Sequence, residues 1–227
     1  MSFLSSVLPI TVDLLQLTLI AFLLKGPFKR YPILFLYCVV LISADVLLGW
    51  AFFGAGTGSP LYRNIYWTSE VLIDLLLFLM VITLTREVMK ENPLWPVVER
   101  MLSIIVVAAV MLPFVLFHPF FTQRWFRHTS QLLSFSGALM NLFLWTGIIG
   151  KRDRDPQLLS VSAGLGVAVT GVAITYGILQ FTSANFRWLP VLFKSLTALG
   201  SMAIWCWAFW PSKREPSPGI EAVPDPS

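Results

Sequence analysis

Charged residues are scarce in this sequence. Only 12% of its 227 residues are Asp, Glu, Lys or Arg, whereas 56% are hydrophobic. An ordinary soluble domain carries about 25% charged residues. The shortage of charge excludes a typical soluble domain and predicts a chain that lies in a lipid bilayer.

Histidine and cysteine are equally scarce, with two of each. A catalytic zinc site needs about three protein ligands, whereas His118 and His128 both lie in a link between apolar runs. Haem held between helices would need paired histidines inside those runs. Cys38 and Cys206 lie within apolar runs, where a thiol behaves as a small buried hydrophobe. We therefore expect no metal, no cofactor and no disulfide framework.

Motifs of common enzymes are missing as well. The sequence contains no His-Glu-x-x-His, no Gly-x-Ser-x-Gly and no glycine-rich phosphate loop. Its formal net charge is +4, but the basic residues form short clusters between apolar runs, as in membrane proteins. We therefore expect neither enzymatic activity nor a nucleic-acid partner.

Seven apolar runs are each long enough, or nearly so, to cross the hydrocarbon core as a helix of about 20 residues. They cover approximately residues 7–24, 31–53, 62–86, 101–117, 131–149, 158–181 and 188–210. The sequence thus predicts an all-α, polytopic membrane protein with a seven-transmembrane-helix bundle over residues 1–211. Residues 212–227 hold four prolines and no apolar periodicity, so we expect a disordered tail there.

Several segments carry more specific expectations. Residues 87–100 mix both charge signs with two prolines and predict a long, amphipathic and partly helical surface connection, with a docking site for a partner as the alternative. Residues 118–128 interleave basic and aromatic side chains typical of a membrane interface. Trp205, Trp207 and Trp210 are expected to anchor the interface in the same way. In the sixth run, Gly164 belongs to a small-residue surface that favours close helix packing.

The basic residues near the ends of the runs predict the orientation. If the N-terminus lies outside, eleven of them face the cytoplasm and four face outward. The cytoplasmic set is Lys25, Lys29, Arg30, Arg86, Lys90, Arg100, Lys151, Arg152, Arg154, Lys213 and Arg214, and the outer set is Arg63, Arg124, Arg127 and Arg187. We therefore expect the N-terminus outside and the C-terminal tail in the cytoplasm.

The third apolar run carries the most informative polar pattern. As a helix, it places Tyr66, Glu70 and Asp74 on one face, because they follow each other at four-residue steps. A charge at the centre of a bilayer costs about 2.5–3.5 kcal/mol or more, so these acids are expected to face the protein interior. Lys194 in the seventh run is the one basic residue predicted at a similar depth.

Further polar residues in the runs fall at a similar depth, in the outer half of the predicted bundle. We therefore expect one outward-facing pocket formed by Asp13, Asp45, Tyr66, Glu70, Asp74, Gln131, Tyr176, Gln180 and Lys194. Four acids exceed what one lysine can neutralise, which favours a pocket that handles a ligand or protons. The alternative is structural: Lys194 pairs with Glu70 or Asp74 and joins the third and seventh helices.

One tract also carries a resemblance to known proteins. The tract is Tyr62-x-x-x-Tyr66-Trp67-x-x-Glu70, followed by a leucine-rich run and then by Arg86-Glu87 and Pro96. It resembles uncharacterised small seven-span membrane proteins of acidobacterial-type bacteria. The resemblance implies the seven-helix layout and a multi-pass location in a bacterial plasma (inner) membrane, but no activity.

A lysine in the seventh run with acids in the third also resembles retinal-binding proteins. In their microbial members a carboxylate lies four residues before the lysine, but here that position is Pro190, which disfavours a retinal-binding protein.

The predicted pocket makes the leading hypothesis a receptor-like or sensory protein that binds an unknown small ligand and acts through a membrane or cytoplasmic protein partner. The alternative is a small transporter or a proton- or cation-handling subunit of a larger membrane complex.

Overall fold

The computed structural model describes residues 2–90, 93, 95–150, 155–182, 186 and 188–210. Over these residues the chain is all-helical, and six of its helices, all except α3, are long and apolar enough to cross a membrane. The helices are α1 (Ser2–Leu24), η1 (Pro27–Lys29), α2 (Pro32–Ala55), α3 (Pro60–Met89), α4 (Trp95–Leu116), α5 (Gln123–Gly150), α6 (Pro156–Phe181) and α7 (Trp188–Ala208). This is the architecture of a multi-pass membrane protein. The predicted tail, and the basic residues expected at 151, 152, 154 and 187, lie outside the described residues.

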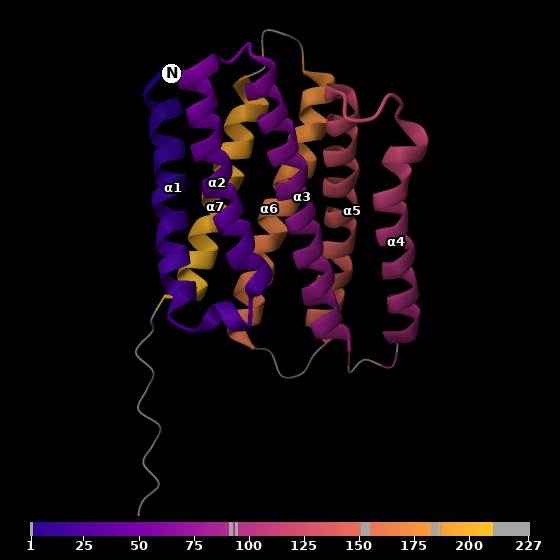
Figure 1. Ribbon diagram of the computed structural model, residues 1–227. Helices are drawn as coiled ribbons and strands as arrows, with labels where there is room; N and C mark the ends of the chain where they lie inside the picture. The colour runs from indigo at the N-terminus through magenta and orange to yellow at the C-terminus, as the bar shows by residue number, and fades with distance from the viewer. Residues whose placement is uncertain are drawn as a thin grey trace, which may run out of the picture.

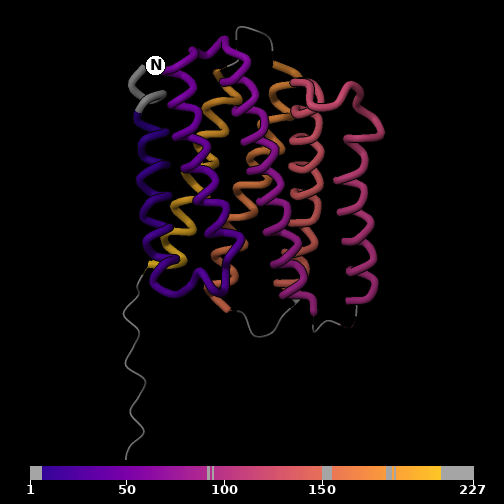
Figure 2. Tube along the Cα trace, in the orientation of Figure 1, coloured from indigo at the N-terminus to yellow at the C-terminus, as the bar shows by residue number. Residues whose placement is uncertain are grey.

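The long helices run side by side and alternate in direction (Figure 1, Figure 2). α1, α3, α5 and α7 begin at the upper end of Figure 1, where the N-terminus is marked, and α2, α4 and α6 begin at the lower end. α1, α2, α3, α5, α6 and α7 pack in that order, and α7 returns to α1, so that these six helices close a ring. α4 stands outside the ring and packs mainly on α5.

Prolines and capping side chains mark where helices begin. α3 starts at Pro60, after Ser59, whose hydroxyl accepts a hydrogen bond from the Tyr62 backbone N–H at 3.1 Å. α6 starts in the same way at Pro156, after the capping side chain of Asp155. These local signals set the ends of α3 and α6 and thereby the depth at which their polar residues enter the bundle.

The connection before α4 is mostly helical, which confirms the partly helical character predicted for residues 87–100. α3 continues to Met89 and α4 begins at Trp95, so the link between them is shorter than predicted. Trp95, Val98 and Leu102 follow each other at three- and four-residue steps and pack against the core. This polar stretch is therefore the amphipathic start of a helix.

The connection before α5 is shortened for a similar reason. α5 begins at Gln123, so Arg124 and His128 lie in its first turns and not in a link. Between them, Trp125 is buried and donates its indole N–H to the carbonyl oxygen of Pro113 in α4 at 3.1 Å. This hydrogen bond fixes the upper end of α4 on α5.

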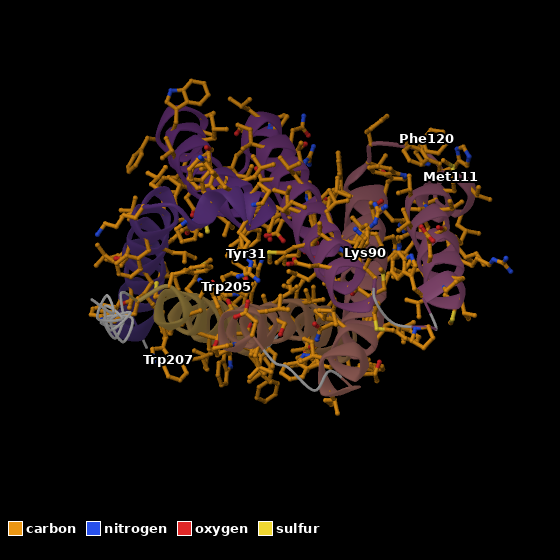
Figure 3. All side chains as sticks on the ribbon, turned by 90° about the horizontal axis from the view of Figure 1, so that it is seen from below. Tyr31, Lys90, Met111, Phe120, Trp205 and Trp207 are labelled. Carbon is orange, nitrogen blue, oxygen red and sulfur yellow. The ribbon has the colours of Figure 1, made fainter. Side chains whose placement is uncertain are left out.

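Trp205 is a core residue, so its prediction as an interfacial anchor is wrong. It is fully buried, donates its indole N–H to the Val161 carbonyl oxygen at 3.0 Å and meets the ring of Tyr37 edge-on. Trp207 and Trp210 are exposed. In the view from below, Trp205 points into the ring of helices and Trp207 points away from it (Figure 3). Whether a tryptophan in the last turn of a helix faces the core or the outside thus depends on its angular position around the helix axis.

Gly164→Ala is expected to destabilise the protein, because the added Cβ would lie 2.6 Å from Cδ1 of Trp205. The small-residue surface predicted for the sixth run is thus confirmed at this position, where α6 meets α7. Overpacking of this kind costs about 1–3 kcal/mol. Gly177→Ala is the matched control in the same helix, since nothing lies within 4 Å of its added Cβ. Equal melting temperatures of the two variants in detergent would contradict the close α6–α7 packing.

A cluster of charges that we call the lower clasp joins three elements at the lower end of the bundle. Arg30, which follows η1, forms an ion pair with Asp155 at the start of α6 at 2.6 Å and lies 3.9 Å from Glu87 near the end of α3. Its guanidinium also lies over the ring of Tyr31, 5.4 Å from the centroid. The clasp therefore connects the first loop to α3 and α6.

Acidification is expected to weaken the lower clasp. Partial burial raises the pKa of the Asp155 carboxyl, but hydrogen bonds from Arg30 and the Gln157 backbone outweigh burial and hold the pKa below its ordinary value. Such a carboxylate stabilises the fold above its ordinary pKa of about 3.9, and this contribution is lost as the pH falls through the lowered value. The effect is small, because the paired side chains are 46% and 34% exposed. Melting temperatures of the wild type and Asp155→Asn should converge between neutral pH and about pH 3, and a constant difference would contradict this.

Candidate ligand-binding cavity

A cavity of about 210 Å³ lies inside the ring of helices. Residues of α1, α2, α3, α6 and α7 line it, and α4 takes no part. Its polar and charged lining consists of Gln16, Tyr37, Asp45, Tyr66, Ser69, Glu70, Asp74, Lys194, Thr197 and Ser201. Lys194 lies about two turns below the start of α7, and Glu70 about three turns below the start of α3. The charged part of the cavity therefore lies in the upper half of the bundle in Figure 1.

An ion pair between Lys194 and Glu70 crosses this cavity. The Lys194 Nζ lies 2.5 Å from the Glu70 Oε1, and the two residues come from α7 and α3, which are not neighbours in the ring. The Glu70 side chain is 13% exposed and that of Lys194 is 44% exposed, because Lys194 borders the open space of the cavity. The sequence left open whether Lys194 meets Glu70 or Asp74, and the structure pairs it with Glu70.

Asp74 lies one turn beyond Glu70 and is the most deeply buried acid of the cavity, with 4% of its surface exposed. Ser130 and Ser134 of α5 lie close to its carboxyl group. Even so, Asp74 Oδ2 and Ser130 Oγ form no hydrogen bond of ordinary geometry with any atom of the described residues. Leaving a buried polar atom unpaired costs about 1–3 kcal/mol, and more for a charged group. Asp74 is therefore a buried carboxyl group that has two serine hydroxyls near it and no hydrogen bond of ordinary geometry at Oδ2.

Asp45 and Tyr66 are the other two residues of the predicted pocket that line the cavity, beside Glu70, Asp74 and Lys194. Asp45 lines it from α2 and is exposed, whereas Tyr66 lies beside Glu70, one turn earlier on α3. With Glu70 and Asp74, three carboxylates line the cavity, and Lys194 is the one basic residue among its described lining residues.

Four predicted pocket residues do not line the cavity, which corrects the predicted pocket. They are Asp13, Gln131, Tyr176 and Gln180. Asp13 and Gln180 are exposed, while Gln131 and Tyr176 are half-buried. Tyr176 lies close to Ser130, behind the cavity wall formed by Asp74. The reason is angular: depth in the bundle does not fix the direction in which a side chain leaves its helix. On α1, it is Gln16 that points inward, and its Nε2 donates to the Cys38 carbonyl oxygen at 2.7 Å.

The sequence-based pocket also missed several lining residues. Tyr37, Thr197 and Ser201 belong to the cavity but not to the predicted set. A signal was available on α7, because Lys194, Thr197 and Ser201 follow each other at three- and four-residue steps and so share one helix face. No comparable pattern marks Tyr37 within its apolar run.

Comparisons of the chain with protein-family models, with curated proteins and with solved structures give no match. The resemblance to acidobacterial-type seven-span proteins therefore stays a prediction. Within the described ranges, no three His, Cys, Asp or Glu side chains come together to hold a metal ion.

Proposed function

We propose that this chain is a seven-span, receptor-like membrane protein that binds a small ligand in the cavity and signals through a protein partner. The observation that carries the proposal is the cavity, where three carboxylates and one lysine gather between apolar helices. Ionisable groups inside a membrane domain are costly and usually serve a function. α3 supports the count of seven, because its 30 residues run alongside the six candidate spans (Figure 1).

The size of the cavity favours a small ligand. A volume of about 210 Å³ corresponds to roughly seven water molecules at ~30 Å³ each. Typical sites for drug-sized molecules are larger, about 300–1,000 Å³. The proposed ligand is therefore a small metabolite or ion.

The lower end of the bundle supports binding over free passage. Below the cavity, Leu23, Leu34 and Leu84 are buried in a continuous apolar core. At the lower end, Tyr31 meets Phe209 edge-on, with ring centroids 5.5 Å apart. An apolar core of this kind offers no polar groups to a passing ion, so it favours a receptor over an open channel.

We further propose that the N-terminus lies outside and the tail in the cytoplasm of a bacterial plasma membrane, so that the cavity faces outward. Reporter fusions test this orientation. A reporter inserted between Gly54 and Pro60 should be active outside, and one placed after residue 150 should be active in the cytoplasm. The reverse pattern would place the cavity on the cytoplasmic side and contradict an outward-facing receptor.

Filling the cavity is expected to abolish ligand binding. Ala198 of α7 lines the cavity, so Ala198→Leu would occupy part of its space without changing its charge. Ser195→Leu is the matched control, because Ser195 is on the same helix but does not line the cavity. The measurement is a thermal-shift screen of a metabolite library in nanodiscs. Compounds that bind the cavity should stabilise the wild type and Ser195→Leu but not Ala198→Leu; compounds that stabilise all three bind elsewhere.

A second candidate function, a proton- or cation-handling subunit, is favoured by one observation. Polar groups continue beyond the cavity, since Asp74 lies close to Ser130 and Ser134, and Tyr176 of α6 lies close to Ser130. Such a row of hydroxyls could relay protons. Proteoliposomes separate the two functions: a relay gives proton flux that Asp74→Asn abolishes, whereas a receptor gives ligand binding without flux.

A further inference from the structure

The charge of the cavity restricts the chemistry of its ligand. Lys194 is held 2.5 Å from Glu70, so these two charges cancel. Asp45 and Asp74 also line the cavity, and neither forms an ion pair within the described part of the chain. The lining residues from α1 and α6 are uncharged. The cavity thus offers two carboxylates in excess to whatever enters it.

Asp74 is the part of this excess negative charge that is most deeply buried in the cavity wall. The residue lines the cavity and is 96% buried, and its Oδ2 forms no hydrogen bond of ordinary geometry with the described residues, although the hydroxyls of Ser130 and Ser134 lie close to the carboxyl group. A donor that carries positive charge would satisfy this carboxyl group twice, by a hydrogen bond and by charge compensation. An anionic ligand would meet the same group with repulsion.

The remaining walls suit an organic cation. Val12, Leu41 and Val172 provide apolar surface, and Tyr37 and Tyr66 provide aromatic rings of the kind that attract ammonium groups. A bare metal ion prefers several oxygen ligands at once, and no three acidic or His or Cys side chains converge within the described ranges. The volume of about 210 Å³ leaves room for a short carbon chain.

We infer that the ligand of this cavity is a small organic ammonium ion whose nitrogen binds Asp74 and whose carbon chain lies against the apolar wall. This inference rests on the proposed function, since it names the class of ligand for the same cavity. Asp45, the more exposed carboxylate, attracts the cation toward the cavity from α2. The Lys194–Glu70 pair positions the walls and does not contact the bound nitrogen.

The test is a thermal-shift and calorimetric titration of the full-length protein in nanodiscs with matched probes. The probes are n-butylammonium, neutral n-butanol, anionic butyrate, and sodium chloride at the same ionic strength. Butylammonium should raise the melting temperature by about 5–10 °C at roughly a hundred times its Kd, and the other probes should not. Alkylammonium ions of increasing length should bind more tightly until the cavity is full and then more weakly.

Two aspartate variants localise the effect. Asp74→Asn should abolish the butylammonium shift measured against its own ligand-free melting temperature, whereas Asp13→Asn, an exposed acid outside the cavity, should keep it. Equal shifts with sodium would overturn the organic class. The absence of any shift with the ammonium series in the wild type would overturn the inference outright.

Failure of the inference and failure of the proposed function give different results. If butyrate or a neutral library compound stabilises the wild type and loses this effect in Ala198→Leu, the cavity is a ligand site for another chemical class. If no compound shows a shift that Ala198→Leu removes, the proposed function fails with the inference.

Discussion

Lys194→Met is expected to lower the melting temperature, and the double variant Lys194→Met/Glu70→Gln should recover most of that loss. Removing the lysine leaves Glu70 charged and 13% exposed between helices. Breaking a buried pair costs about 3–5 kcal/mol, and the 44% exposure of Lys194 reduces this to about 1–3 kcal/mol. Removing both charges avoids the unpaired ion, so the two losses should not add. The measurement is a double-mutant cycle of melting temperatures in nanodiscs.

A second cycle provides the control. Asp74 lies one turn from Glu70 but forms no ion pair with Lys194, so the cycle of Lys194→Met with Asp74→Asn should show much weaker coupling. Strict additivity in the Glu70 cycle would show that the ion pair does not form in the membrane. A double variant that is stable but loses ligand binding would show that the ion pair positions the cavity walls for the ligand, whereas one that keeps ligand binding would show that the pair is purely structural.

Asp74→Asn is expected to raise the melting temperature of the ligand-free protein while it abolishes binding. The substitution keeps the shape of the side chain but removes a carboxylate that is buried without a donor for its Oδ2. The gain should be about 1–3 kcal/mol, because Asn removes the buried charge and its amide N–H groups can donate to the nearby hydroxyl oxygens of Ser130 and Ser134. In the proposed function, Asp74 gains its partner only when the ligand binds.

Asp45→Asn is the matched control for this prediction. Asp45 also lines the cavity, but it is exposed and not buried, so removing its charge should change stability by less. The measurement is the melting temperature of both variants without ligand. A destabilised Asp74→Asn would mean that the carboxylate is already satisfied within the protein, which removes the main support for a ligand at this position.

The pairing of Glu70 with Lys194 was within reach of the sequence. Acids at four-residue steps share a helix face, and a charge in hydrocarbon is costly enough that the one lysine at similar depth is its natural partner. The helical class was predictable on the same basis, because composition and long apolar runs decide it. Six of the apolar runs predicted from the sequence correspond to the six helices that are candidate membrane spans in the structure.

The sequence did not predict which side of each helix faces the interior of the bundle. Asp13 and Gln16 lie at similar depth on α1, but the exposed residue is the charged one, and Gln16 is buried against α2. Trp205 and Trp207 are two residues apart and face opposite sides of α7. Trp205 is the one that packs against Gly164 of α6. These outcomes depend on which helices are neighbours in the ring, and a single sequence does not specify that order.

The most direct test of an outward-facing ligand cavity is cysteine accessibility. Ser69 lines the cavity, whereas Ser162 on α6 is fully buried away from it. Each is changed to cysteine in a background where Cys38 and Cys206 are replaced by alanine, and intact cells are treated with a membrane-impermeant thiol reagent. Ser69→Cys should be modified from outside and protected by the ligand, and Ser162→Cys should stay unmodified. An unreactive Ser69→Cys, or one that reacts only from the cytoplasmic side, would contradict an outward-facing cavity.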